Sequence, residues 1–123
     1  AVRAALASGR YWREVYVGTQ VEGATVEGFI DLLYEGPEGL VVVDYKTDSA
    51  RSLDDIARAM ERYRRQGAAY ALALEAALGR QVADVRFVFT EPRHEEPIGE
   101  LAAAKQDVRQ RIRKVLARRM AVS

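Results

Sequence analysis

Two aspartates and a lysine in the first half of the chain have the types and the spacing that a phosphodiester-cleaving site needs. Asp44 and Lys46 are two residues apart at the end of the apolar segment LVVVDYK. In an extended strand both side chains point to the same face, about 6–7 Å apart. Asp31 lies in another apolar run, and a turn over 35–39 would put it at nearly the same distance from the tip as Asp44. We therefore expect the three side chains to converge from adjacent strands.

Carboxylates held close together are suited to a hard divalent cation. They raise one another's pKa, and Mg²⁺ or Mn²⁺ relieves the repulsion through oxygen ligands. A metal-bound water loses its proton more readily and attacks phosphorus, while a lysine beside it orients the water or offsets charge on the phosphate. The alternative is that Asp31 and Asp44 are ordinary strand-end acids and Lys46 is their salt-bridge partner, because D-x-K alone is a common triplet.

Further motifs favour the catalytic interpretation. The chain resembles the RecB/AddA-type nuclease domain of the PD-(D/E)XK superfamily, the C-terminal nuclease domain of UvrD-like helicase–nucleases, in Gly28-Phe29-Ile30-Asp31, Asp44-Tyr45-Lys46-Thr47-Asp48 and Gln66-Gly67-Ala68-Ala69-Tyr70. The resemblance covers about residues 13–90. It implies that Asp31, Asp44 and the Tyr45 backbone carbonyl bind Mg²⁺ or Mn²⁺ and that Lys46 is the catalytic lysine.

Gln66 and Tyr70 are four residues apart and so share one face of a predicted helix. An amide and a hydroxyl can each orient a phosphate or the lysine. Because they match the family's Q-x-x-x-Y motif, we expect both to position the substrate. Tyr63 lies on the same side, and we expect it to be an ordinary core residue.

Three other residues have types that could serve such a site: Glu14, Thr47 and His94. Glu14 begins a predicted strand where related nucleases often carry a glutamate, so it is either a further acid of the site or a solvated residue. Thr47 is a further candidate as part of the D-Y-K-T motif. Many family members use a histidine on a helix before the first strand as a metal ligand, and His94, the only histidine, does not match that motif. Either the histidine ligand lies upstream of Ala1 or the protein works without it. We favour the first, in which the chain is a fragment and its metal affinity and activity in isolation depend on the upstream segment.

Arginine supplies most of the positive charge. Three of the 19 basic residues are lysine, and the net charge of +1 does not by itself indicate a nucleic-acid partner. Two sets follow helical spacing and could contact DNA phosphates without reading sequence: Arg58, Arg62 and Arg65, and Arg109, Arg113 and Lys114. The alternative is solvated helix faces, and the final helix could equally pack against a helicase partner.

The elements that hold these residues follow from hydropathy and turn signals. We expect strands over 13–18, 24–34 and 40–46, with a hairpin turn at 35–39, and a further strand over 82–90. Helices are expected from Ser52 or Asp54 to Leu78, where Gly79 ends the helix, and over about 99–119. Residues 2–7 look like the tail of another helix.

The second strand and the end of the last strand have distinct residue patterns. Strict alternation in the second strand puts Ile30 and Leu32 on one face, with Phe29, Asp31 and Leu33 on the other. A charged loop bracketed by Pro92 and Pro97 follows the last strand, which can pair in parallel after a helical crossover. The order (α)βββαβα indicates an α/β fold, and the resemblance implies a restriction-endonuclease-like core, a mixed central sheet flanked by helices.

Composition limits the remaining classes. At 123 residues the chain can bury a core as one domain, and we treat 1–123 as a single domain. The absence of cysteine excludes disulfides and an iron–sulfur cluster within this chain. No apolar run approaches the length of a membrane span, so we expect no membrane partner.

These features together predict a metal-dependent deoxyribonuclease, expected to be an exonuclease. By the resemblance, it would act on single-stranded DNA behind a helicase domain or subunit, in recombinational DNA repair. The expected location is the bacterial cytoplasm, associated with the nucleoid during action. The alternative is a non-catalytic DNA-binding or scaffolding module with the same fold.

Overall fold

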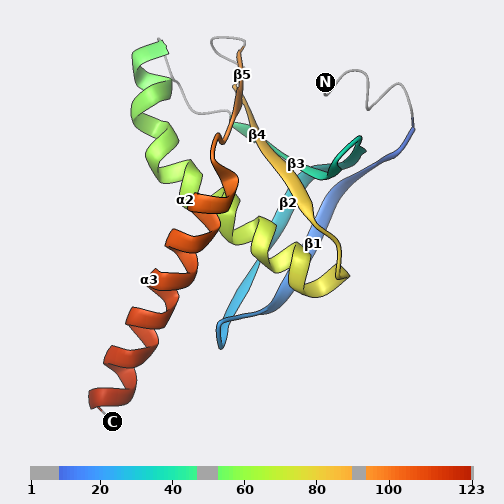
Figure 1. The fold of residues 1–123 in the computed structure, drawn as a ribbon. Coiled ribbons are helices and arrows are strands. Elements are labelled where there is room, and N and C mark those ends of the chain that lie inside the picture. The colour runs from blue at the N-terminus through green and yellow to red at the C-terminus, as the bar shows by residue number, and fades with distance from the viewer. Residues whose placement is uncertain (1–8, 47–52, 90–93, 123) are drawn as a thin grey trace.

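A five-stranded mixed sheet and two long helices make up the computed structural model, which describes residues 9–46, 53–89 and 94–122 (Figure 1). In chain order the elements are β1 (Tyr11–Val21), β2 (Ala24–Gly36), β3 (Gly39–Lys46), α2 (Leu53–Leu78), β4 (Val82–Phe89), β5 (His94–Pro97) and α3 (Leu101–Val122). The strand order in the sheet is β1-β2-β3-β4-β5. The helix expected at 2–7 and the candidate Thr47 lie outside the described residues.

The predicted meander is confirmed, with longer strands than expected. β1, β2 and β3 pair antiparallel in succession, and the β2–β3 hairpin closes through a two-residue turn, Pro37 and Glu38. Its pairing runs from Gly36–Gly39 to Leu32–Val43. Asp31 and Asp44 are the next residues along the two strands, so the register brings them to equivalent positions beside each other.

The second half of the sheet agrees with the crossover expectation and adds a strand. α2 carries the chain across the sheet, and β4 then pairs parallel to β3, with Lys46 beside Phe89. The expectation of a charged loop between Pro92 and Pro97 is partly wrong, because residues 94–97 form β5, which pairs antiparallel to β4. Its charged residues occupy the sheet edge, where Glu95 accepts a hydrogen bond from Arg86 of β4 (3.1 Å), and strand pairing there uses the backbone whatever the side-chain hydropathy.

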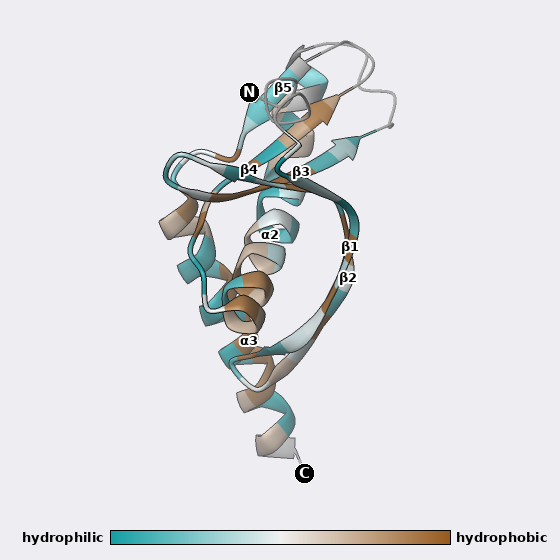
Figure 2. Ribbon diagram, turned by 90° about the vertical axis from the view of Figure 1, so that its right-hand side faces the viewer, coloured by the Kyte–Doolittle hydropathy of each residue, from teal (hydrophilic) through white to brown (hydrophobic). Residues whose placement is uncertain are grey.

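The helices lie on one side of the curved sheet. α2 runs across the concave side of the β1–β2 hairpin (Figure 2), and α3 contacts α2 near its middle and then diverges from it (Figure 1). The core between them combines apolar residues from the inner side of the sheet with the buried side of α2, including Leu33, Val42, Leu72 and Phe87. A second apolar cluster lies on the opposite side of the sheet: Leu32, Tyr34, Val41 and Val43.

Two side chains fasten α3 to the rest of the fold. The Arg64 guanidinium of α2 donates to three successive backbone carbonyls before α3, those of Ile98, Gly99 and Glu100 (2.8, 2.7 and 3.2 Å). Farther along α2, the Glu75 carboxylate accepts from the Val82 N–H (2.9 Å) and the Lys105 ammonium (2.7 Å). Each contact ties α2, which carries part of the candidate site, to its neighbours.

The expected alternation in β2 is wrong at one point. Ile30 and Leu33 belong to the inner core, whereas Leu32 lies in the cluster on the opposite side of the sheet. Residues two apart therefore end on opposite faces, which a regular pleat does not allow. Asp31 lies within this interruption, so the direction of its side chain differs from the one that regular alternation predicts.

Candidate active site

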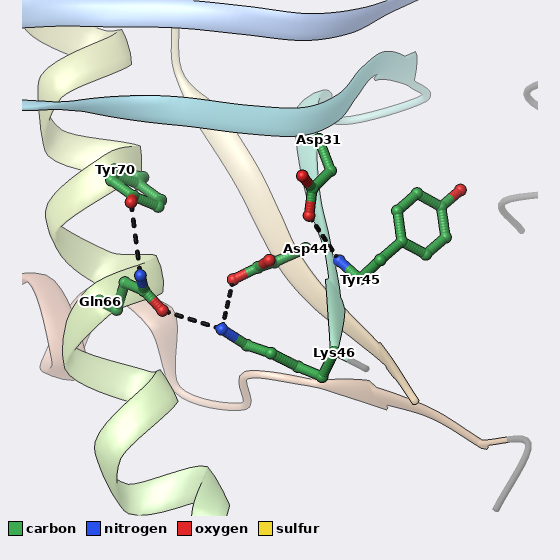
Figure 3. Close-up of polar contacts among 6 residues, drawn as sticks. All are labelled: Asp31, Asp44, Tyr45, Lys46, Gln66 and Tyr70. Atoms are coloured by element: carbon green, nitrogen blue, oxygen red, sulfur yellow. Dashed lines mark hydrogen bonds and ion pairs between the residues drawn. The ribbon is translucent and has the colours of Figure 1, made fainter. Parts of the chain in front are cut away.

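The Lys46 ammonium joins β3 to α2. It forms an ion pair with Asp44 Oδ2 (2.8 Å) and donates a hydrogen bond to Gln66 Oε1 (2.9 Å) (Figure 3). Asp44 and Lys46 share the face of β3 that looks towards α2, as their spacing predicts. The two side chains keep only 17 % and 12 % of their exposure, so their charges interact with little screening by water.

Asp31 reaches the same region from β2. Its Oδ2 accepts a hydrogen bond from the Tyr45 backbone N–H (2.8 Å), which ties the carboxylate to the peptide between Asp44 and Lys46. Figure 3 shows the Asp31 and Asp44 carboxylates on the same side of β3, one from each strand. The predicted convergence of these two acids with Lys46 is therefore present in the fold.

The electrostatics of Asp44 fit a site that carries a cation during function. Burial raises the pKa of the Asp44 carboxyl above its usual value; the Lys46 ammonium opposes this, and the neighbouring Asp31 carboxylate adds to it. Burial and a like charge both disfavour the ionised form. The lysine alone thus leaves the negative charge of this pair undercompensated.

Gln66 and Tyr70 extend the site along α2. While Gln66 Oε1 accepts from Lys46, its Nε2 donates to the Tyr70 hydroxyl (3.3 Å). Tyr70 in turn lies directly over Gly28 of β2, where a Cβ atom would come within 2.7 Å of the hydroxyl oxygen. The glycine of the first motif thus makes room for the tyrosine of the third, which connects the two motifs physically.

A divalent cation fits the donor set in part. Both Asp contacts use Oδ2 atoms, so the Asp31 and Asp44 Oδ1 atoms are the candidate ligands, and hard oxygen donors suit Mg²⁺ or Mn²⁺. Within residues 9–46, 53–89 and 94–122, no group of three or more His, Cys, Asp or Glu side chains is placed to hold a metal. Two carboxylates with backbone oxygen and water remain a usual arrangement for Mg²⁺, which keeps several waters.

The other sequence candidates lie outside this cluster. Glu14 falls between the pairs Arg13–Leu32 and Val15–Ile30, which sets it across from Asp31, but it is exposed. Arg58 pairs with Asp55 within α2, and Arg65 of α2 pairs with Asp107 of α3. His94 begins β5, away from the motif position of the family's histidine.

Tyr63 is the residue whose place the sequence reasoning missed. It is buried, as expected, but its ring centroid lies 4.0 Å from the Lys46 Nζ. The spacing held a signal, since Tyr63 precedes Gln66 by three residues and so shares its side of the helix. What the sequence lacked was the docking of α2 against the end of β3.

The structure brings Asp31, Asp44, Lys46, Gln66 and Tyr70 together on one sheet and one helix, and comparisons with known proteins identify the class of the chain. The model of the PD-(D/E)XK nuclease superfamily matches residues 2–122, and the chain belongs to this superfamily.

Within that class, two similar bacterial proteins carry the same name. The chain is 44 % identical over 79 residues to an ATP-dependent helicase/nuclease subunit of Desulforudis audaxviator and 40 % identical over 80 residues to its namesake in Anoxybacillus flavithermus. These alignments cover 62 % and 61 % of this chain but only 6 % and 7 % of those proteins. The chain is thus similar to a small part of much longer relatives.

A solved structure supports the fold. The crystal structure of a candidate exonuclease from Eubacterium rectale superposes with a TM-score of 0.59 at 20 % identity, covering 85 % of this chain and 44 % of that one. At this identity the similarity concerns the fold alone. In the described part of the chain, neither helix has the length and apolar character needed to cross a membrane.

Proposed function

We propose that this chain is a metal-dependent deoxyribonuclease domain that hydrolyses phosphodiester bonds at the Asp31–Asp44–Lys46 cluster. The observation that carries the proposal is the Lys46 ammonium held between Asp44 and Gln66, beside a second carboxylate from β2. An ordinary surface salt bridge needs neither the glutamine nor the second acid. Superfamily membership and the names of the relatives support the nuclease chemistry.

The side chains divide the work as follows. Asp31 and Asp44, with the Tyr45 carbonyl, would hold Mg²⁺ or Mn²⁺, which when bound would make a water more acidic and offset charge on the phosphate. Lys46 orients the attacking water and stabilises negative charge developing on the phosphate. Gln66 and Tyr70 fix the lysine and position the phosphate. The water oxygen forms the new P–O bond, and an ester P–O bond breaks to release a hydroxyl end.

The names of the similar proteins support a wider context in a helicase–nuclease. We propose that 1–123 is a single nuclease domain from a longer helicase–nuclease, because it matches a small part of much longer relatives. In that setting it acts as an exonuclease on single-stranded DNA delivered by a helicase domain or subunit, in recombinational repair. The corresponding location is the bacterial cytoplasm, at the nucleoid during action.

One observation favours a second candidate function. Only two carboxylates meet in the site, and among the described residues no third His, Cys, Asp or Glu side chain completes a metal-binding group there. A module that binds or scaffolds DNA without cutting it would keep the same fold and tolerate an incomplete ligand set. Activity measurements separate the two functions.

The test is a nuclease assay on single- and double-stranded DNA with Mg²⁺ or Mn²⁺, using this chain and a version extended upstream. We expect Asp44→Ala and Lys46→Ala each to lower the rate about 100-fold or more, the range for removing one group that stabilises transition-state charge. Glu38→Ala, at the exposed β2–β3 turn, is the matched acidic control and should cleave normally.

The outcomes are distinct. Cleavage that survives both Asp44→Ala and Lys46→Ala contradicts the site assignment. A folded, extended wild type that binds DNA and does not cut it contradicts the nuclease proposal and favours the binding module. Activity only in the extended version supports the missing upstream ligand.

A further inference from the structure

The Lys46 ammonium has three N–H donors, and three acceptors surround it. Asp44 Oδ2 and Gln66 Oε1 take two of them at 2.8 and 2.9 Å. In the remaining direction the face of the Tyr63 ring lies 4.0 Å from Nζ, well inside the range for a cation–π contact. The ammonium therefore has a carboxylate, an amide and an aromatic ring as its partners.

The Tyr63 ring is itself held in place. It is 9 % exposed and packs against Phe87 and Phe89 of β4, with centroid separations of 5.8 and 6.2 Å. Phe87, fully buried, also lies 5.8 Å from the lysine Nζ. Aromatic rings from α2 and β4 (Tyr63 and Phe87) thus pack beneath the Lys46 side chain of β3.

This support matters because a lysine side chain is long and flexible. Ordering its four rotatable side-chain bonds costs conformational entropy. The ion pair with Asp44 and the hydrogen bond to Gln66 each fix the ammonium in one direction, and the Tyr63 ring contacts it from a third direction. An aromatic face attracts the cation without a directional acceptor atom, so an incoming oxygen of the substrate can replace it without breaking the contacts to Asp44 and Gln66.

We propose that Tyr63 is a positioning residue for the lysine of the site, and that its ring rather than its hydroxyl carries this role. The inference rests on the proposed function for its kinetic consequence, whereas the ring–ammonium contact stands independently of it. The partner of the ring is the Lys46 ammonium, and the effect is to place that charge before substrate arrives.

The kinetic test compares Tyr63→Phe with Tyr63→Leu in the DNA-cleaving form of the protein. Phenylalanine keeps the aromatic face, so we expect kcat within about twofold of wild type. Leucine fills the space without a π face, so kcat should fall roughly 3- to 30-fold, the range expected for a cation–π contact, with KM nearly unchanged. Val21→Ala, a buried change near the far end of β1, lowers stability without touching the site and should leave kcat unchanged.

A second readout does not depend on cleavage. The chain has three lysines, so NMR spectra labelled at the lysine ε carbon are simple, and Lys46→Arg assigns the resonance. The ring should shift the Lys46 ε protons upfield in wild type and Tyr63→Phe, and the shift should disappear in Tyr63→Leu.

These measurements separate the two proposals. An unshifted Lys46 resonance in wild type, full kcat in Tyr63→Leu, or an equal loss in Tyr63→Phe and Tyr63→Leu overturns the role of the ring. If Lys46→Ala cleaves as well as wild type, or if the folded, upstream-extended wild type does not cleave, the proposed function fails. The NMR shift then still decides the contact.

Discussion

The Asp44 carboxyl shows how a site residue is placed at a cost to the fold. Burial, the largest cause, raises its pKa from the usual 3.8; Lys46 opposes the change, and Asp31 adds to it. Because the pKa of the folded state is the higher one, stability falls as the pH rises from the unfolded pKa through the folded pKa, and it stays lower above that window. Above that window the ionised Asp44 therefore destabilises the metal-free protein.

This sign leads to a stability prediction for Asp44→Asn. In chelator at pH 7 the variant should melt at a higher temperature than wild type, because the amide keeps the shape and has no charge to bury. The difference should vanish at acid pH, where wild-type Asp44 is protonated. Differential scanning fluorimetry over a pH series measures both.

Metal provides the control for the same prediction. Mn²⁺ or Mg²⁺ that binds the folded state raises the melting temperature with concentration. We expect that rise in wild type and a much smaller one in Asp44→Asn. Asp44 would instead be a structural acid if Asp44→Asn melts at a lower temperature than wild type in chelator at pH 7. The same would follow if metal raises the melting temperature of the variant as much as that of wild type.

Much of this residue pattern could be predicted from spacing. A period of two places Asp44 and Lys46 on one face, and a period of 3.6 does the same for Gln66 and Tyr70. The contact between Lys46 and Gln66 could not be predicted in this way, because it depends on how α2 docks on the end of β3. The aromatic role of Tyr63 was hidden for the same reason.

At the scale of elements, the irregular stretch shared by β1 and β2 explains how Asp31 is turned. Glu14 has a φ of +52° within β1, a left-handed conformation that non-glycine residues seldom adopt in a strand. Its register position is across from Asp31, where β2 loses its alternation. Glutamate gives no sequence signal for left-handed backbone, so a regular strand was the natural expectation.

The junction between α2 and β4 depends on Gly67. A Cβ atom there would lie 2.8 Å from Val85 Cγ1 and 2.9 Å from Phe87 Cζ, and both of those side chains are fully buried. Glycine within a helix is normally unfavourable by about 1 kcal/mol relative to alanine. The close approach of helix and strand explains why the second residue of the Gln66-to-Tyr70 motif is nevertheless glycine.

We therefore expect Gly67→Ala to destabilise the protein despite its better helix propensity. Overpacking a filled core costs about 1–3 kcal/mol, which should exceed the gain of about 1 kcal/mol and leave a net loss of roughly 1 kcal/mol. Urea denaturation measures the change, and cleavage should fall as well, because the helix must lift Gln66 away from Lys46. A more stable Gly67→Ala variant would mean that α2 packs less closely against β4 than these distances indicate.

Gly79→Ala provides a comparison in which backbone strain alone acts, because the added Cβ meets nothing within 4 Å but φ is +64°.

At the scale of the whole molecule, charge is concentrated on α3. This helix contains seven basic residues and one acid, Asp107. Its inner side is anchored: Arg113 and Arg109 pair with Glu22 at the tip of the β1–β2 hairpin, and Leu116 lies beside Gly23. The last turns of α3 extend past that tip (Figure 1).

The outer side of α3 forms an open groove with a basic character. Its lining residues are Asp107, Gln110, Arg111, Lys114, Val115 and Arg118. Arg111, Lys114 and Arg118 follow helical spacing and form a row, and Arg65 of α2 reaches Asp107 at its start (3.8 Å). Such a row suits the backbone of a nucleic-acid strand, whereas a helicase surface packed on this face would need acids to match it.

Salt dependence distinguishes these two roles of α3. For a single strand, the slope of log K against log salt concentration changes by about 0.7 for each phosphate contact. Replacing Arg111, Lys114 and Arg118 by alanine should therefore weaken binding of an unpaired oligonucleotide and reduce that slope by about 2, measured by fluorescence anisotropy in chelator so that no cleavage occurs. Arg80→Ala, which removes an exposed charge paired with Glu35 at the other end of the fold, should leave the slope nearly unchanged. An unaltered slope in the triple variant would mean that the strand is held by α2 and the site alone, and it would exclude this face of α3 from the DNA path. The face would then be the better candidate for contact with the helicase portion.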